Sequence, residues 1–320
     1  MNQKQETFLG SLGDTSPLAG KTPMSEQAPP PFSSKTWSQR QRYAFIENRL
    51  YWEGELTRSA LMERFGISGP QASDDVARYL ELAPQSVEYD RVRKAYIPTR
   101  HFQPRVTVPD ARQYLTQLLL LADDAIASGD SWLGDVPIHA VMPRVRRRLD
   151  TETLRPVVSA IRHRRAIEIR YQSMSTPDPV LRWIAPHALV YDGARWHIRG
   201  WCFNKSRFTD FVLARILQIG DSRVSPMDPS LDREWEEFFT IELSPHPDLS
   251  EWQRQAIEMD YGMEDGVVRI RMRLCMTWYF ERHYGLDIPV ECLPAARRQI
   301  VIRNRAELDA LRLSCATSDD

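Results

Sequence analysis

The sequence predicts an α+β protein made of several small domains, and three observations lead to this prediction. The chain has 320 residues, about twice the usual length of one domain. Helix-type periodicity dominates up to about residue 150, and short alternating segments typical of strands follow. Hydrophobic residues make up 42% and charged residues 27% of the chain, which is an ordinary globular composition.

Composition excludes several classes of protein. The longest apolar run covers residues 118–122, far short of the roughly 18 residues that a membrane helix needs. The N-terminus lacks the basic and apolar segments of a secretory signal. Four cysteines, Cys202, Cys275, Cys292 and Cys315, are too sparse for a disulfide scaffold or a zinc knuckle. We therefore expect a cytoplasmic protein with no membrane segment, no metal and no other cofactor.

The basic residues are mostly arginine, although the net charge is only −1. Arginine supplies 37 of the 42 basic residues and lysine the other five. The planar guanidinium binds phosphate and carboxylate groups through two parallel hydrogen bonds. A GC-rich genome also favours arginine codons, so the positions of the arginines have to decide between the two explanations.

The first hundred residues combine a tail with a compact helical domain. Residues 1–35 are rich in Gly, Ser, Pro, Thr and Gln and lack periodicity, which predicts a disordered tail. Residues 36–104 are predicted to form a helix over 38–52, a short helix over 59–65 that Gly66 ends, a helix that follows Ser68, and two strands, 86–89 and 95–98, around a charged turn. This order of elements is that of a winged helix-turn-helix.

The middle of the chain changes from helices to strands. Residues 105–154 are predicted to be a helical connector, with one apolar stripe around residues 115–122 and a second at Val141, Val145 and Leu149. Residues 155–225 contain five predicted strands, over 166–171, 181–184, 188–191, 196–203 and 208–219, with a hairpin turn at Asp192-Gly193. Several short strands in so few residues predict a small β-barrel.

The last segment, residues 226–320, mixes helices and strands. The pattern predicts a helix over 250–261, a strand over 266–276, a short helix over 278–284, a strand over 299–303 and a final helix over 306–313. An alternation of this kind predicts a small α+β domain.

Three segments of the predicted barrel resemble the WYL domain, an SH3-like (Sm-type) barrel found behind winged helices in bacterial transcriptional regulators. The matching segments are Ile169-Arg170-Tyr171-Gln172-Ser173 with Pro186-His187, then Trp196-His197-Ile198 in place of Trp-Tyr-Leu, and Phe211-Val212-Leu213-Ala214-Arg215-Ile216. Two of the three signature letters differ from the family's. The resemblance covers roughly residues 36–315 and extends to the winged-helix/WYL repressors that control phage-defence islands.

The resemblance implies a regulator of transcription. Its partners would be double-stranded operator DNA and a second copy of the chain, with residues 226–320 as the dimerisation domain. The WYL domain, residues 155–225, would hold a sensor pocket for a phosphate-bearing ligand, either a nucleotide or an oligonucleotide.

The predicted DNA-binding residues lie at the start of the first helix, on the third helix and in the basic turn between the two strands. Gln bonds adenine edges, Ser bonds bases or phosphates, and a basic turn is suited to the phosphate backbone. The alternative is a solvated basic turn, since residues 36–105 hold 11 basic against 9 acidic residues. The predicted set is Arg40, Arg42, Ser68, Gln71, Ser73, Arg78, Arg91, Arg93 and Lys94.

The predicted ligand-binding residues come from neighbouring strands and loops of the barrel. Arginines that converge on a concave face are costly to desolvate unless an anion neutralises them, and Trp196 offers a stacking surface. The alternative is that the arginines pair with local acids such as Asp210 and Glu168, and that Trp196 and Phe211 are core residues, which we favour for these two. The predicted set is Tyr171, Ser173, His187, Trp196, His197, Arg199, Arg207 and Arg215.

An enzyme is not predicted. The sequence lacks a glycine-rich phosphate loop, His-Glu-x-x-His and Gly-x-Ser-x-Gly. The best nucleophile is Cys202 with His197 or His187 as its base, but His197 and Cys202 would face opposite sides of one strand. We therefore expect a homodimeric repressor that binds an inverted repeat. An activator of the same architecture and a single-stranded nucleic-acid-binding accessory protein are the alternatives.

Overall fold

The computed structural model of the chain describes residues 37–143 and 145–316. These residues form two compact units, one up to residue 145 and the other from residue 146 onward. The predicted disordered tail, residues 1–35, lies outside the described residues.

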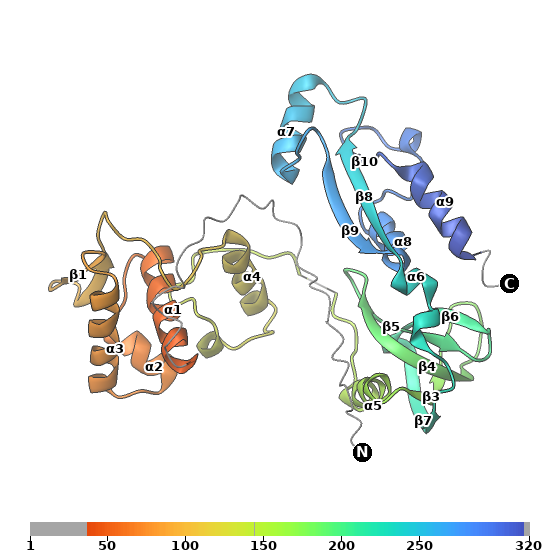
Figure 1. Cartoon of the computed structure of the whole chain (residues 1–320), viewed down its shortest axis with the longest axis horizontal. Coiled ribbons are helices and arrows are strands. Elements are labelled where there is room, and N and C mark those ends of the chain that lie inside the picture. The colour runs from red at the N-terminus through yellow and green to blue at the C-terminus, as the bar shows by residue number, and fades with distance from the viewer. Residues whose placement is uncertain (1–36, 144, 317–320) are drawn as a thin grey trace, which may run out of the picture. The chain divides into compact units, whose positions relative to one another are not determined.

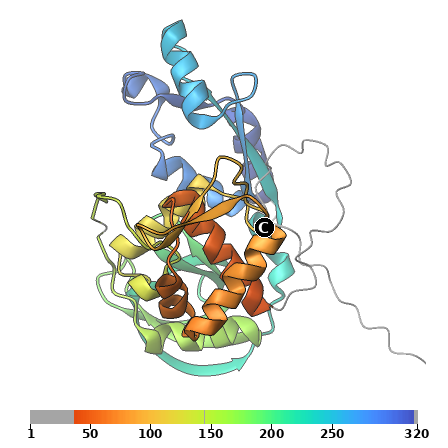
Figure 2. The same cartoon turned by 90° about the vertical axis from the view of Figure 1, so that its left-hand side faces the viewer.

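The first unit begins with three helices and a hairpin, as the sequence predicts. Helices α1 (Trp37–Trp52), α2 (Arg58–Phe65) and α3 (Gly69–Leu82) precede the antiparallel strands β1 (Val87–Asp90) and β2 (Ala95–Pro98) (Figures 1 and 2). All three helices contribute to one core, whose members include Tyr43, Leu50, Leu61, Val76 and Tyr79. The winged helix-turn-helix prediction is therefore confirmed.

Local signals separate α2 from α3. Gly66 ends α2 in the left-handed conformation with φ of 61°, which a residue with a Cβ adopts only at a cost. The Ser68 side chain then accepts a hydrogen bond from the backbone N of Gln71 at 3.4 Å and caps α3. These two residues make the tight turn that sets α3 against the other helices.

The connector contains one α-helix rather than the predicted two. Helix α4 (Ala111–Ala122) is followed by a 3₁₀ turn, Ser128–Asp130, and the described residues between 131 and 150 lack regular structure. Val145 and Leu149, expected on the apolar face of a second helix, are 90% and 51% exposed. The prediction of that helix is wrong, and within the described residues the side chains of Val145 and Leu149 stay largely in solvent instead of packing on a core.

The second unit starts with helix α5 (Thr151–Arg162) and an antiparallel five-stranded sheet (Figure 1). Its strands are β3 (Arg165–Tyr171), β4 (Val180–Tyr191), β5 (Trp196–Cys202), β6 (Arg207–Val212) and β7 (Ile216–Val224). The segments 181–184 and 188–191, predicted as two strands, form the single strand β4. The segment 208–219, predicted as one strand, is divided by the 3₁₀ turn Leu213–Arg215.

This sheet is open, so the predicted closed barrel is corrected. The hydrogen-bonded order is β6-β5-β4-β3-β7, which leaves β6 and β7 as the two edges. Ile169, Ile184, Ile198 and Phe211 on one face pack against Val157 of α5. In a closed barrel, pairing of β6 with β7 would enclose this apolar face, whereas here helix α5 covers it.

The rest of the second unit is a small α+β domain, as predicted. Strand β8 (Phe238–Pro245) lies between β10 (Ile300–Ile302) and β9 (Val268–Arg273) in an antiparallel sheet. Helices α6 (Arg233–Glu236), α7 (Glu251–Tyr261), α8 (Leu274–His283) and α9 (Arg305–Ala316) accompany it (Figure 1). Strand β8 was not predicted. Within the described ranges, every helix is too short or too polar to cross a membrane.

Candidate nucleic-acid interface and ligand site

Helix α3 presents a polar face to solvent. Gln71, Asp74 and Arg78 are exposed and recur at helical spacing. Arg78 Nε donates to Asp74 Oδ1 at 3.1 Å, and Gln71 Nε2 donates to Asp75 Oδ2 at 3.2 Å. Because the Gln71 and Arg78 side chains remain in solvent, both are free to exchange these contacts for groups on a ligand.

Ser73 brings a further cation to this face. Ser73 Oγ donates to the carbonyl of Gly69 at 3.0 Å and accepts a hydrogen bond from Arg58 Nη1 at 3.2 Å. Arg58 is the first residue of α2 and is exposed. It is not among the predicted residues, and its position at the start of the helix before α3 is the signal that could have identified it.

Arg42 is held inside the domain, which corrects its predicted role. Its Nε and Nη2 lie 2.6 Å and 3.2 Å from the carboxylate oxygens of Asp75, whose side chain is fully buried. This pair joins α1 to α3, and opening it would leave the Asp75 charge buried and unpaired. Arg40, two residues earlier, is exposed and stays a candidate contact.

The turn between β1 and β2 holds three cations in solvent on a fixed backbone. Asp90 Oδ1 accepts hydrogen bonds from the backbone N of Arg93 at 3.1 Å and of Val92 at 2.7 Å, and these bonds lower the pKa of Asp90. Arg91, Arg93 and Lys94 are all exposed. An ordered basic tip of this kind suits the phosphate backbone of DNA.

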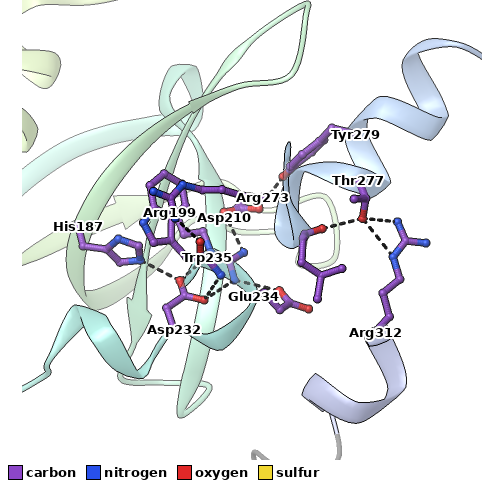
Figure 3. Close-up of polar contacts among 11 residues, drawn as sticks. His187, Arg199, Asp210, Asp232, Glu234, Trp235, Arg273, Thr277, Tyr279 and Arg312 are labelled. Atoms are coloured by element: carbon purple, nitrogen blue, oxygen red, sulfur yellow. Dashed lines mark hydrogen bonds and ion pairs between the residues drawn. The ribbon is translucent and has the colours of Figure 1, made fainter. Parts of the chain in front are cut away.

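Arg199 lies at the centre of a buried polar network (Figure 3). Its neighbour Ile198 packs in the core with Val157 of α5, so Arg199 faces the other side of the five-stranded sheet. Its Nε and Nη2 each lie 2.7 Å from an oxygen of Asp232, and Nη2 is also 2.9 Å from Glu234. Nη1 is 3.5 Å from Asp210, and His187 Nε2 is 2.8 Å from Asp232. Arg199 is 4% exposed and Asp232 1%. The alternative pairing of Arg199 with local acids is thus the one that forms.

The same network reaches helix α8 of the C-terminal domain. Tyr279 donates to Asp210 at 2.8 Å and packs on the ring of His197, with centroids 4.9 Å apart. His197 Nε2 in turn lies 2.8 Å from Asp192. Arg199, His187 and His197 therefore belong to a joint between the sheet and the C-terminal domain. Their polar groups therefore already have partners within the chain, which leaves less of them for the ligand that the sequence predicts.

A cavity of about 740 Å³ lies beside this joint, against α8 and α9. Its charged lining consists of three carboxylates and two guanidiniums, namely Asp210, Glu234, Asp309, Arg199 and Arg312. Both guanidiniums are already engaged, since Arg312 Nη2 lies 2.6 Å from Glu281. A phosphate would meet more negative than positive charge here, so the cavity does not fit the predicted anionic ligand.

Tyr171, predicted to line the ligand pocket, is buried in the core, and Trp196, which we expected in the core, is partly exposed. Tyr171 is 7% exposed, accepts a hydrogen bond from Val212 N at 3.1 Å and packs edge-on against Phe211 with centroids 5.2 Å apart. Trp196 is 41% exposed and packs on Tyr191. The core assignment is confirmed for Phe211, which is 2% exposed, and is wrong for Trp196.

Ser173 and Arg215 lie beside the 3₁₀ turn Leu213–Arg215, which strand β5 also contacts, and we call the surface of Ser173, Trp196 and Arg215 the rim. Gln172 N donates to the carbonyl of Arg215 at 3.1 Å, which brings the segment carrying Ser173 to the 3₁₀ turn that ends at Arg215. Trp196 is the first residue of β5, which contacts the same turn. Arg207 pairs with the last residue of β5, so the structure does not bring it to the rim.

Cys202 and His197 do face opposite sides of β5, as predicted. Cys202 is fully buried in the core beneath α5, whereas His197 packs on Tyr279. A catalytic pair between these two residues is therefore excluded by the fold.

The carboxylates of the joint make the second unit sensitive to acid. Burial alone would raise the pKa of Asp192, but hydrogen bonds from His197, from the Ala194 backbone and from Arg195 outweigh it and hold this pKa far below its usual value. Burial would likewise raise the pKa of Asp232, and its hydrogen bonds lower it. Such a group contributes stability that is fully present above its unfolded pKa and is lost as the pH falls through the folded one.

We expect the second unit to lose stability below about pH 4, where carboxyl groups begin to protonate in the unfolded chain. Asp192→Asn removes one titrating group, so the free energy of unfolding should fall less steeply with acid in this variant. Urea unfolding of the full chain at several pH values measures both slopes. Equal slopes for the variant and the natural chain would contradict the assignment.

Comparison with known proteins follows the division seen in the structure. Residues 38–120 match the model of the BrxR transcriptional regulator winged helix-turn-helix domain. Residues 152–220 match the WYL domain. Residues 238–308 match the BrxR transcriptional regulator C-terminal dimerization domain. The three matches cover the winged helix with α4, the open sheet with α5, and the three-stranded sheet with its helices.

Curated relatives match over most of their own length. DNA-binding transcriptional repressor CapW of Stenotrophomonas maltophilia is 37% identical over 279 residues, 86% of this chain and 93% of that protein. The protein of the same name from Escherichia coli (strain KTE188) is 38% identical over 275 residues, 86% of this chain and 92% of that protein. Among solved structures, proteasome accessory factor B/C of Arthrobacter aurescens aligns with 19% identity, covering 85% of this chain and 45% of that one. Its TM-score of 0.26 is too low to establish a common fold. The identities and the shared domains place this chain in the CapW family of transcriptional repressors, a family of non-enzymatic regulators with the domain composition of BrxR.

Proposed function

We propose that this protein is a homodimeric repressor that binds an inverted repeat in double-stranded DNA and controls phage-defence genes. The observation that carries the proposal is the exposed polar face of α3 beside the basic tip between β1 and β2. The relatives are named DNA-binding transcriptional repressors, and residues 238–308 match a dimerization domain. Because a repressor acts at the chromosome, the proposed location is the cytoplasm.

In this proposal α3 enters the major groove and the basic tip contacts the flanking phosphates. Gln71 and Arg78 are the side chains placed to reach base edges, since Gln pairs with adenine and Arg with guanine. Arg91 and Lys94 would bind phosphates, as would Arg58. A two-fold dimer presents two such surfaces and therefore reads two half-sites in inverted orientation.

Replacing Arg91 and Lys94 by alanine should weaken binding to all duplex sequences about equally. Each lost phosphate contact reduces the dependence of log K on log salt concentration by about 1. The double variant removes two contacts from each subunit, so a dimer bound to both half-sites loses four and the slope should fall by about 4. Mobility shifts with the duplex upstream of the gene, measured at several salt concentrations, give this slope. Arg112→Ala, which removes an exposed arginine of α4, is the matched control and should leave the slope unchanged.

Two further outcomes would decide against this function. If the protein binds single strands of the same DNA more tightly than the duplex, it is an accessory single-strand-binding protein. If deletion of the gene lowers expression of a reporter driven by the upstream promoter, the protein is an activator. The proposal requires preference for the duplex and a rise in expression on deletion.

We further propose that the rim binds the regulatory ligand, a nucleotide or short oligonucleotide. Trp196 is 41% exposed at the start of β5 and offers a surface for a base. Within residues 37–143 and 145–316 the Arg215 guanidinium has no ion-pair partner, so it is free to bind a phosphate. A ligand that binds one dimer conformation more tightly shifts the affinity for DNA by the same free energy.

Arg215→Ala should raise at least tenfold the concentration of ligand that releases operator DNA, while binding to the operator without ligand stays unchanged. The probes are nucleoside monophosphates and a short single-stranded DNA, added to mobility shifts at constant ionic strength. Arg207→Ala removes an equal charge at the other end of β5 and should respond like the natural chain. Equal loss in both variants would indicate general electrostatics instead of a site at the rim.

A further inference from the structure

An arginine is buried in the C-terminal domain without a carboxylate to neutralise it. Arg298 is 7% exposed. Its Nη1 donates to the carbonyl of Ile288, and its Nη2 lies 3.5 Å from the carbonyl of Leu286. Its Nε is buried and has no hydrogen-bond partner in the part of the chain that the structure describes. Across the same residues, no carboxylate lies within ion-pair distance of this guanidinium.

A second guanidinium adjoins the first. Arg305 Nη2 donates to the same carbonyl, that of Leu286, at 2.7 Å. The acid that serves Arg305 is Glu281, whose Oε2 lies 2.7 Å from Arg305 Nη1 while its Oε1 lies 2.6 Å from Arg312. One carboxylate is therefore shared by two arginines, and the hydrogen bonds that Arg298 donates within the described residues go to backbone carbonyls.

Both guanidiniums line one cavity of about 470 Å³. The rest of its lining is mainly apolar and includes Ile288, Val290 and Val301. The cavity lining contains one carboxylate, that of Asp287. This carboxylate lies 4.0 Å from Arg282, a residue that is not part of the lining. The volume is within the range of small-molecule pockets and exceeds what a single water-bridged ion needs.

A buried charge without a partner is unfavourable, and here the neighbouring charge adds to the cost. Burial and the adjacent Arg305 guanidinium lower the pKa of Arg298 below its usual value and outweigh the Glu291 and Asp287 carboxylates, which act in the opposite direction. Replacing a buried charge by an apolar group is often neutral or stabilising, so an isolated buried arginine is poorly explained by folding alone. An anion bound in the cavity would recover part of the lost Coulomb energy by contact with the two guanidiniums that line it.

We propose that the cavity at Arg298 and Arg305 binds a small carboxylate ligand with an aliphatic body. The two guanidiniums would hold the carboxylate, and the apolar wall formed by the loop around Ile288 and by Val301 would cover the aliphatic part. This site belongs to the C-terminal domain and is distinct from the rim and from α3, so it is independent of both proposals above.

Calorimetric titration of the full-length protein with hexanoate and with acetate, at constant ionic strength, tests the site. Hexanoate should bind at least ten times more tightly than acetate, because only hexanoate covers the apolar wall. Arg298→Met should weaken hexanoate binding at least tenfold. Arg297→Gln, which changes the exposed neighbouring arginine, is the matched control and should stay within twofold of the natural chain.

Circular dichroism keeps the test independent of folding. Arg298→Met should unfold at the same or a higher temperature than the natural chain when no carboxylate is present. Hexanoate should raise the melting temperature of the natural chain and of Arg297→Gln, but not that of Arg298→Met. If Arg298→Met does not fold, Arg305→Gln replaces it with the same expected loss of affinity. Equal binding of hexanoate by Arg298→Met and the natural chain overturns the proposal. The proposal is also overturned if the natural chain does not bind hexanoate. If either arginine variant then weakens dimerisation, the arginines serve the subunit contact instead.

Discussion

Replacing Glu47 by alanine is expected to lower the free energy of unfolding of the winged helix by about 3–5 kcal/mol. The Glu47 side chain is fully buried in α1. Its Oε1 accepts hydrogen bonds from the Tyr79 hydroxyl at 3.0 Å and from Arg105 N at 2.6 Å. Its Oε2 accepts from Val106 N at 2.9 Å and from the backbone N and hydroxyl of Thr107 at 2.8 Å and 3.0 Å. One carboxylate therefore joins three separate segments of the domain.

The size of this effect follows from the donors that the alanine would leave behind. Three backbone N–H groups and the hydroxyls of Tyr79 and Thr107 would lose their acceptor, and a buried unsatisfied donor costs about 1–3 kcal/mol. Tyr79 is fully buried and bears the full cost, whereas residues 105–107 are partly or fully exposed, so their donors can bond water instead. Burial and the Glu47 charge raise the pKa of Tyr79, so its hydroxyl stays protonated and remains a donor at all ordinary pH values.

Hydrogen exchange of peptides from residues 37–107 measures the loss selectively, since the second unit is monitored in the same experiment. Tyr79→Phe removes only one of the five hydrogen bonds and is the matched control, with an expected cost of about 1 kcal/mol. Operator binding should fall in parallel with the folded fraction. If Glu47→Ala is no less stable than Tyr79→Phe, the carboxylate does not hold these segments together.

Local signals made the winged helix predictable. Gly66 and Ser68 act on their immediate neighbours, and the buried stripe of α3 follows helical spacing. The role of Glu47 depends on groups 32 to 60 residues away along the chain, and in the sequence it is an ordinary polar residue of a helix. The pairing of Arg42 with Asp75, 33 residues away, is hidden for the same reason.

The second unit marks the limit of pattern-based prediction more clearly. The alternation of apolar and polar residues predicts most of the strands of the five-stranded sheet. Whether such a sheet closes into a barrel depends on whether its two edge strands pair, which this pattern does not show. Here β6 and β7 stay unpaired edges, and α5 covers the apolar face. Val145 and Leu149 have the spacing of an amphipathic helix. Such a segment forms a stable helix only where its apolar face packs on another part of the protein. The sequence predicts that Arg199 binds an anionic group, and in the structure this group is the carboxylate of Asp232.

Replacing Arg199 by alanine is expected to cost the second unit about 3–5 kcal/mol, because Asp232 would stay buried with its main partner removed. Two 2.7 Å contacts join these side chains, both nearly inaccessible to solvent. His187 would remain as the second group on Asp232, and the loss of charge balance would loosen α6 and α8 from the sheet. Dimerisation and operator binding should therefore decline together with folding.

Arg199→Lys is the sharper variant, because lysine keeps the charge but lacks the two parallel donors that match a carboxylate. It should recover part of the stability that alanine loses, whereas Arg215→Ala at the rim should lose none. Hydrogen exchange of peptides from β5, α6 and α8 gives the three values. An Arg199→Ala protein that folds and binds operator like the natural chain, yet fails to respond to nucleotide, would falsify the buried joint. That result would instead support the prediction from the sequence that Arg199 binds the ligand.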